Sequence, residues 1–135
     1  MIRHPKYLAL LWFVLANSAY ADIYRHDTGS LIPGTEGITP GPGVELDHRD
    51  LNGANLRELD LTGARFDSSD LTYADLSSST LTGTNLTGAI VASAYLYDTT
   101  SRGFTADQLY STQSYQAKSL GGIGLGWNDL TGWDL

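Results

Sequence analysis

The sequence contains no cysteine, so no disulfide can stabilise the fold. Basic residues are scarce as well, since 8 Lys and Arg stand against 15 Asp and Glu. A chain this acidic repels nucleic-acid phosphates, and we expect no nucleic-acid partner. No apolar run approaches the roughly 20 residues that a membrane-spanning helix requires. A chain of 135 residues is one small domain at most, and its stability has to come from burial and backbone pairing.

The first 21 residues have the layout of a secretory signal peptide. A basic start, MIRHPK, precedes an apolar run of about ten residues, YLALLWFVLA, and a small-x-small site ends at Ala21. We expect cleavage after Ala21 and export of the mature chain to the periplasm, the cell surface or the medium, with no membrane contact afterwards. An uncleaved amphipathic anchor is the alternative. Loss of Arg3 and Lys6 leaves 6 basic and 15 acidic residues, a net charge of −9.

Residues 22–43 are rich in proline and glycine and show no periodicity, which predicts an irregular N-terminal arm. From 44 to 98 a large apolar residue then recurs at every fifth position. Small residues usually stand two places earlier, as Ala54 and Ala74 do. The recurring positions, which we call the core ladder, are Leu46, Leu51, Leu56, Leu61, Phe66, Leu71, Leu76, Leu81, Leu86, Val91 and Leu96.

A period of five fits neither regular secondary structure. Residues five apart on a helix drift by about 140° at each step, and on a flat strand they alternate between faces because five is odd. A chain that bends after every five residues keeps each fifth side chain on a common axis. Four such sides close a coil of 20 residues, and coils stacked about 4.8 Å apart can pair their backbones. We therefore expect an all-β solenoid of about three coils.

The repeats ANLRE and ADLSS follow the pattern A(D/N)LXX, which resembles the pentapeptide-repeat family. The resemblance covers residues 44–98 and implies a right-handed quadrilateral β-helix. A leucine-rich horseshoe would need a period of 20 to 29 with a different internal pattern.

In a 20-residue coil, residues 20 apart stack in outward columns. The expected columns are Glu45, Arg65 and Asn85; Asn55, Asp75 and Tyr95; Asp50, Asp70 and Ile90; and Asp60 and Thr80.

The phase of five is lost at residues 99–117, which we predict to be an inserted loop or short helix. Thr105 and Gln108 have the spacing of a capping box, which would start a helix near Ala106. The segment from GFTADQLYSTQSYQAK onward resembles one that recurs in certain exported bacterial pentapeptide-repeat proteins, without an assigned activity. The fives resume in 118–135, about one further coil. Its core positions are Leu120, Leu125, Leu130 and Leu135.

Large side chains of the insertion and the last repeats form a candidate interaction surface. The alternative is that those of the insertion pack onto the solenoid. The candidates are Phe104, Leu109, Tyr110, Tyr115, Trp127 and Trp133. Because the last repeats end in a core leucine, we expect a truncated piece of a longer repeat protein, end-to-end self-association through this coil, or a frayed end.

Chemical motifs are weak. Asp50 and Asp70 would stack as a carboxylate pair, but on an exposed wall rather than in a cleft. His48 beside Asp47 and Asp50 offers one imidazole, too little for a metal site. No G-x-S-x-G elbow occurs. We therefore predict no catalytic residue, no metal and no cofactor.

Two further local features have structural explanations. The run GGIGLGW lacks the context of a dinucleotide or calcium site, and we expect it to form loose corners of the last coil. Arg49 stands at a small inward position of the first coil, where its side chain could extend to solvent beneath the arm.

Three functions remain open from the sequence. The first is a non-enzymatic, exported structural or protein-interaction scaffold with an unknown protein or cell-surface partner. The second, implied by the family resemblance, is a DNA mimic that inhibits or protects a nucleic-acid enzyme, which the export signal disfavours. The third is an exported carbohydrate-active enzyme, which would need a carboxylate-lined groove.

Overall fold

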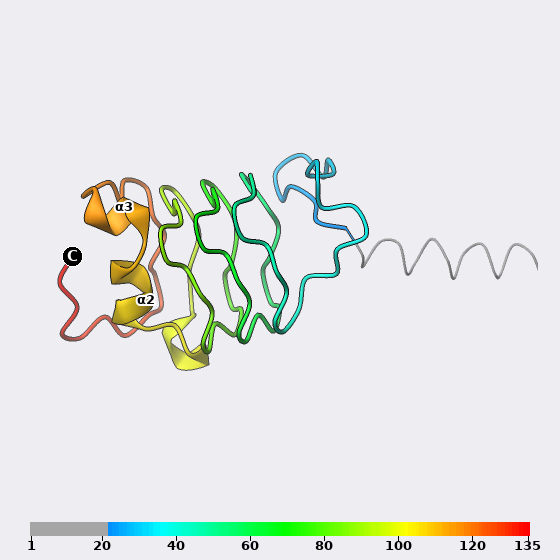
Figure 1. The fold of residues 1–135 in the computed structure, drawn as a ribbon. Helices are drawn as coiled ribbons and strands as arrows, with labels where there is room; N and C mark the ends of the chain where they lie inside the picture. The colour runs from blue at the N-terminus through cyan, green and yellow to red at the C-terminus, as the bar shows by residue number, and fades with distance from the viewer. Residues whose placement is uncertain (1–21) are drawn as a thin grey trace, which may run out of the picture.

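The computed structural model describes residues 22–135, and the expected signal peptide lies outside them. The described chain winds into stacked coils that form an elongated solenoid, with the N-terminal arm at one end and the C-terminus at the other (Figure 1). Three helical elements interrupt the coils near the C-terminal end. They are η1, Thr100–Arg102; α2, Ala106–Tyr110; and α3, Gln113–Gln116.

Neighbouring coils are joined by parallel β-bridges between residues 20 apart, as the period of five predicts. The bridges form four columns around the solenoid, one for each side of a coil. They join Glu45, Arg65 and Asn85; Asp50, Asp70 and Ile90; Asn55, Asp75 and Tyr95; and Asp60 and Thr80. The four outward columns expected from the sequence are therefore confirmed.

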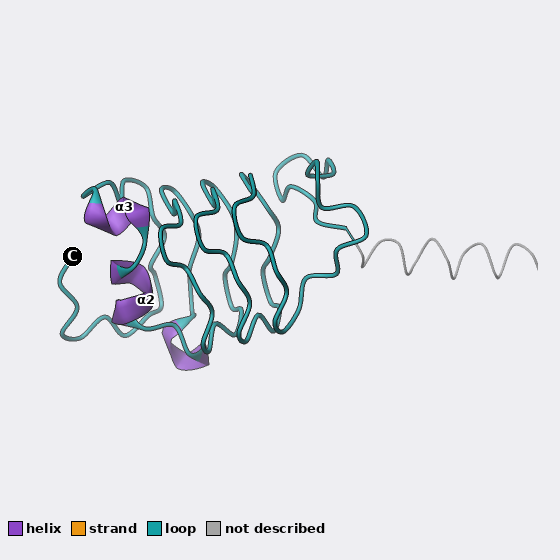
Figure 2. Cartoon of the chain, in the orientation of Figure 1, coloured by secondary structure: helices purple, strands orange, loops and turns teal. Residues whose placement is uncertain are grey.

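The chain turns at the second residue after each ladder position, where the backbone is left-handed. Glycine occupies several of these corners, with φ of 70° at Gly53 and 67° at Gly63, but His48 and Glu58 adopt φ of 56° and 58°. A corner every five residues leaves each side too short for a strand. The described residues accordingly contain isolated bridges and no extended strand or sheet (Figure 2), so the expected all-β class is met only in part.

The core ladder from Leu46 to Leu96 is buried throughout and fills the axis of the solenoid. The small residues two places earlier, such as Ala64 and Ala74, are fully buried beside it. Leu120, Leu125 and Leu130 of the last repeats are only half-buried. The ladder therefore forms one continuous apolar column that is most completely covered in the first three coils.

The N-terminal arm closes one end of this column and is more ordered than the sequence suggests. Ile23 and Ile32 are buried against the core, and Arg25 pairs with Ala54 in an antiparallel bridge. The Arg49 guanidinium donates a 2.5 Å hydrogen bond to the Gly34 carbonyl, as expected for a side chain that leaves the axis beneath the arm.

The insertion replaces part of a coil instead of leaving the solenoid. Tyr95 bridges to Gly124, 29 residues later, so this coil is nine residues longer than the others. The predicted capping box is confirmed: the Thr105 hydroxyl accepts from the Gln108 backbone N–H, and the Gln108 side chain accepts from the Thr105 N–H. α2 and α3 lie side by side at the C-terminal end of the solenoid (Figure 1).

Candidate functional site

The insertion contributes mainly to packing. Phe104 is 3% exposed and Leu109 is fully buried, so these two residues cannot form an accessible interaction surface. They were expected as surface candidates, and the structure places them in the core because they fill the axis where the ladder skips. The ring of Trp133 packs on Phe104, with ring centroids 5.5 Å apart.

Tyr110 and Tyr115 are half-buried and are largely engaged with each other. Their ring centroids lie 4.5 Å apart. The Tyr110 hydroxyl accepts from the Asp134 backbone N–H at 2.6 Å, and the Tyr115 hydroxyl donates to the Asp134 carbonyl at 2.9 Å. This pair ties α2 and α3 to the last repeat. A hollow of about 540 Å³ beside it is lined by Tyr115, Gln116, Lys118, Leu120, Asp134 and Leu135.

Trp127 is different, because 86% of its surface is exposed. It is the first of four rings that contact one another along one side of the solenoid. The ring centroids are 5.8 Å apart for Trp127 and Tyr97, 5.9 Å for Tyr97 and Tyr95, and 5.6 Å for Tyr95 and His26. We call these four residues the aromatic ledge.

Three members of the ledge were absent from the predicted interaction surface, although Tyr95 stood in a predicted outward column. Tyr95 and Tyr97 flank the ladder residue Leu96, so the period of five already points both side chains outward. Trp127 lies in the coil next to Tyr97, but the spacing does not show this because the coil between them is nine residues longer than the others. His26 arrives from the arm, and its Nε2 donates a 2.7 Å hydrogen bond to the Tyr73 carbonyl. No sequence period could have placed it there.

The glycine run GGIGLGW provides the space for a ledge ring. A Cβ at Gly124 would lie 2.6 Å from the Tyr97 ring, and a Cβ at Gly126 would lie 3.1 Å from it. The expected corners are present, because Gly121, Gly122 and Gly126 lie in turns and the φ of Gly122 is 74°. Glycine at 124 and 126 also lets Tyr97 lie against the backbone of the last repeats.

Trp127 also occupies a left-handed corner, with φ of 59°. A non-glycine residue in this conformation costs roughly 1–2 kcal/mol. Gly53 and Gly63 take equivalent corners at lower cost. Other non-glycine residues, such as His48 and Glu58, adopt the same conformation at their corners, so the exposed ring and not the backbone distinguishes Trp127.

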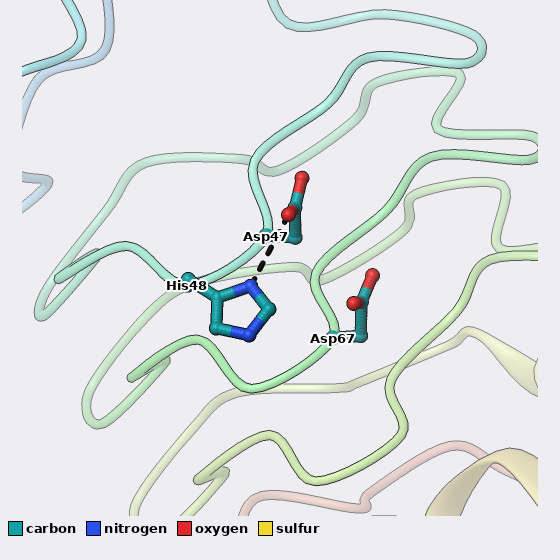
Figure 3. A group of neighbouring side chains, drawn as sticks. All are labelled: Asp47, His48 and Asp67. Carbon is teal, nitrogen blue, oxygen red and sulfur yellow. Dashed lines mark hydrogen bonds and ion pairs between the residues drawn. The ribbon is translucent and has the colours of Figure 1, made fainter.

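A second cluster joins Asp47, His48 and Asp67, whose ligand atoms lie within 4.8 Å of one another (Figure 3). Asp67 from the next coil takes the place that the sequence interpretation gave to Asp50. The His48 Nδ1 lies 3.2 Å from Asp47, and its hydrogen bond is the main cause of the lowered pKa of that carboxyl. Arg65 lies 3.2 Å from Asp67 and 3.8 Å from Asp47, so both carboxylates already have a cationic partner. The cluster is an exposed ion-pair network with one imidazole.

Asp50 and Asp70 stack as expected, but each carboxylate serves its own turn. Asp50 accepts from the Asn52 N–H at 3.1 Å and Asp70 from the Thr72 N–H at 2.9 Å. They are not aimed at a common substrate position.

Within 22–135 no helix is long and apolar enough to cross a membrane.

Five-residue steps around a buried ladder, with four bridge columns, define the class of this protein as a solenoid of short repeats. The particular family is the pentapeptide repeats, whose family model matches residues 50–88 in eight copies. Residues 50–88 are therefore pentapeptide repeats, which confirms the resemblance seen in the sequence over this segment. The match ends before the insertion, and no curated protein and no solved structure matches the chain.

Proposed function

We propose that this chain is a non-enzymatic, exported pentapeptide-repeat protein that acts as a scaffold for a protein or cell-surface partner. Its coils would take the right-handed quadrilateral β-helix that the family implies. The observation that carries the proposal is Trp127, a large side chain that is 86% exposed at a strained corner of an otherwise well-packed solenoid. Such a residue contributes little to the fold and much to a contact surface.

The rigidity of the solenoid supports a scaffold. Each coil donates backbone hydrogen bonds to the next, for example from Leu56 to Asp75 at 2.8 Å and from Leu76 to Tyr95 at 2.8 Å. A fixed backbone holds the outward side chains in place without the entropic cost of ordering a loop on binding.

The surface columns give less support to the other functions. A DNA mimic needs an even acidic surface, whereas Arg65 lies between Glu45 and Asn85 in one column. A carbohydrate-active enzyme needs two free carboxylates facing one substrate, whereas Asp50 and Asp70 each accept a turn hydrogen bond.

Export is tested by expressing the full chain with a C-terminal tag in a bacterium and fractionating the cells. We expect the tagged product in the envelope or medium. Its mass should correspond to a chain whose first residue is Asp22. A cytoplasmic product that retains its first residues would contradict export. Inhibition of gyrase supercoiling by the purified chain at micromolar concentration would favour the DNA mimic instead.

Scaffolding is tested by capture of envelope components on the immobilised chain and on Trp127→Gly. Glycine suits the left-handed corner, so the variant should fold while the exposed ring is lost. We expect a component that binds the parent chain and not the variant. Equal capture by both would show that the aromatic ledge is not the contact surface.

A further inference from the structure

We infer that the aromatic ledge binds a neutral polysaccharide by stacking sugar rings on Trp127 and Tyr97. The inference rests on the proposed scaffold function and names the chemical class of its partner. The ledge consists of rings that contact one another at centroid distances of 5.6 to 5.9 Å, so it forms a continuous strip and not a set of scattered residues. Trp127 is exposed and the other three rings are half-buried, so the strip presents one open ring with partly accessible rings beside it.

The exposure of the Trp127 ring is not explained by packing within the fold. Its ring contacts Tyr97 and is otherwise open to solvent, while its backbone holds the left-handed conformation of the solenoid corners, which the smaller residues Ser78 and Asp98 hold in the coils below. Tyr73, whose carbonyl holds His26, shows the same pair of properties, with φ of 59° and 52% exposure. Two large rings are thus held outward at strained corners on the side of the solenoid that carries the ledge.

The ledge is also kept clear of other side chains. Gly124 and Gly126 place bare backbone against the Tyr97 ring, where a Cβ would collide with the ring at Gly124 and contact it tightly at Gly126. Trp127 then rises beside Tyr97 with its plane tilted by 60°. Two rings at this angle form a notch in which one ring can lie flat against a ligand while the other touches its edge.

The charges beside the ledge favour a neutral occupant. Asp75, in the level below Tyr95, lies 3.7 Å from the Arg57 guanidinium. Asp98, one residue from Tyr97, lies 3.4 Å from Arg102. Each acid already has its counter-ion, so neither an anionic nor a cationic ligand gains an unpaired partner here. A neutral ligand needs no charged partner, so these ion pairs do not weaken its binding.

A sugar chain combines the properties that the ledge requires. One face of a pyranose ring presents C–H groups, which pack on the negative face of an aromatic ring, and its hydroxyls can bond to polar groups at the edge. The hydroxyls of Tyr95 and Tyr97 provide such polar groups along the strip. Rigid Trp and Tyr side chains contribute contact area at low entropic cost.

The test measures binding of the full chain to three neutral polysaccharides, hydroxyethylcellulose, galactomannan and dextran, by affinity electrophoresis and calorimetry. We expect at least one to bind. We expect Trp127→Gly to weaken that binding at least about 30-fold, the loss typical of a tryptophan at the centre of a contact. Trp127→Phe should retain part of the affinity because it keeps a ring.

Thermal unfolding separates binding from folding. Trp127→Gly should melt at the same or a higher temperature, because glycine relieves the strained corner. Ser68→Gly makes a matched change at another left-handed corner, which stacks with His48 and Gly88 and not with the ledge, and should leave binding unchanged. A marked drop in the melting temperature of Trp127→Gly would show that Trp127 is a packing residue and would overturn the inference.

The remaining outcomes also decide the inference. Failure of all three neutral polysaccharides overturns it, as does equal binding by the parent chain and Trp127→Gly. Preference for polygalacturonate or for oligolysine would assign the ledge to an acidic glycan or to a basic protein segment. An exported chain that binds no glycan refutes this inference alone, whereas glycan binding by a chain that stays in the cytoplasm refutes only the export part of the proposed function.

Discussion

At the scale of single residues, serine hydroxyls form the hydrogen bonds that close two corners of the first coil. Most corners close with a hydrogen bond from the small inward residue to the preceding ladder carbonyl, as from Ala64 to Leu61. Leu59 is larger than most residues at inward positions of this kind, and its backbone N–H has a different partner. The Ser79 hydroxyl of the next coil instead accepts from the Leu59 N–H at 3.1 Å and donates to the Leu56 carbonyl at 2.6 Å.

We predict that Ser79→Ala lowers the free energy of unfolding by about 1–3 kcal/mol, because it leaves a partly buried N–H and a buried carbonyl without their partner. Alanine itself fits, since Ala64 and Ala74 occupy equivalent positions. Chemical denaturation measures the effect. Ser77→Ala is the matched control and should change little. Similar losses for both variants would contradict the bridging role.

The same arrangement recurs at Arg49, the other large inward residue of this coil. The Ser69 hydroxyl accepts from the Arg49 N–H at 3.1 Å and donates to the Leu46 carbonyl. A large inward residue is thus accompanied by a serine 20 positions later. The two residues form one structural unit across neighbouring coils.

At the scale of elements, Gln108 fixes α2 to the solenoid. Its side-chain oxygen closes the capping box, while its Nε2 donates to the Leu81 carbonyl at 2.7 Å and to the Thr84 carbonyl at 3.0 Å. One side chain therefore satisfies both the start of the helix and two carbonyls of the coil below. This explains how five helical residues remain in place although so short a helix is unstable alone.

We predict that Gln108→Ala lowers the free energy of unfolding by about 1–3 kcal/mol, through loss of the cap and of both carbonyl contacts. Gln113→Ala is the control, because Gln113 is exposed at the first position of α3. Thermal and denaturant unfolding compare the two variants. The assigned role would be refuted by a Gln108→Ala protein as stable as the control. Binding at the aromatic ledge should be unaffected by either change.

At the scale of the whole molecule, acidic side chains stabilise turns all along the solenoid. Hydrogen bonds from Thr62 lower the pKa of Asp60, and those from Thr131 lower the pKa of Asp129 in the same way. The hydrogen bond from Arg25 lowers the pKa of Asp27 in the arm. Each carboxylate is favoured in its charged form by the folded state.

We predict that stability falls below about pH 4. A lowered folded pKa means that the unfolded chain takes up protons first as the pH drops, so the contribution is present above the ordinary carboxyl pKa and is lost as the pH falls through the folded value. Denaturant midpoints at pH 6, 4 and 3 measure this. Asp60→Asn should show a shallower fall, because its side-chain oxygen still accepts from Thr62 without titrating. An unchanged midpoint at pH 3 would contradict the prediction.

Much of the architecture was predictable because the repeat is local. The period of five fixed the ladder, the outward columns and the need for a bend, and Thr105 with Gln108 predicted the helix start. Three contacts were not predictable: the hydrogen bonds of the Ser79 hydroxyl to the coil before it, the packing of Ile23 on the end of the core, and the ring contact of His26 with Tyr95. They depend on residues brought together by stacking, not by spacing.

The sequence by itself determined which side chains face the axis and which face solvent, since each five-residue step repeats the same backbone geometry. Only the tertiary structure decided which outward rings meet. The coil that the insertion lengthens places Trp127 beside Tyr97, and the folded arm carries His26 to Tyr95. Those contacts depend on how many residues each coil contains and on where the arm packs, and no local pattern encodes either.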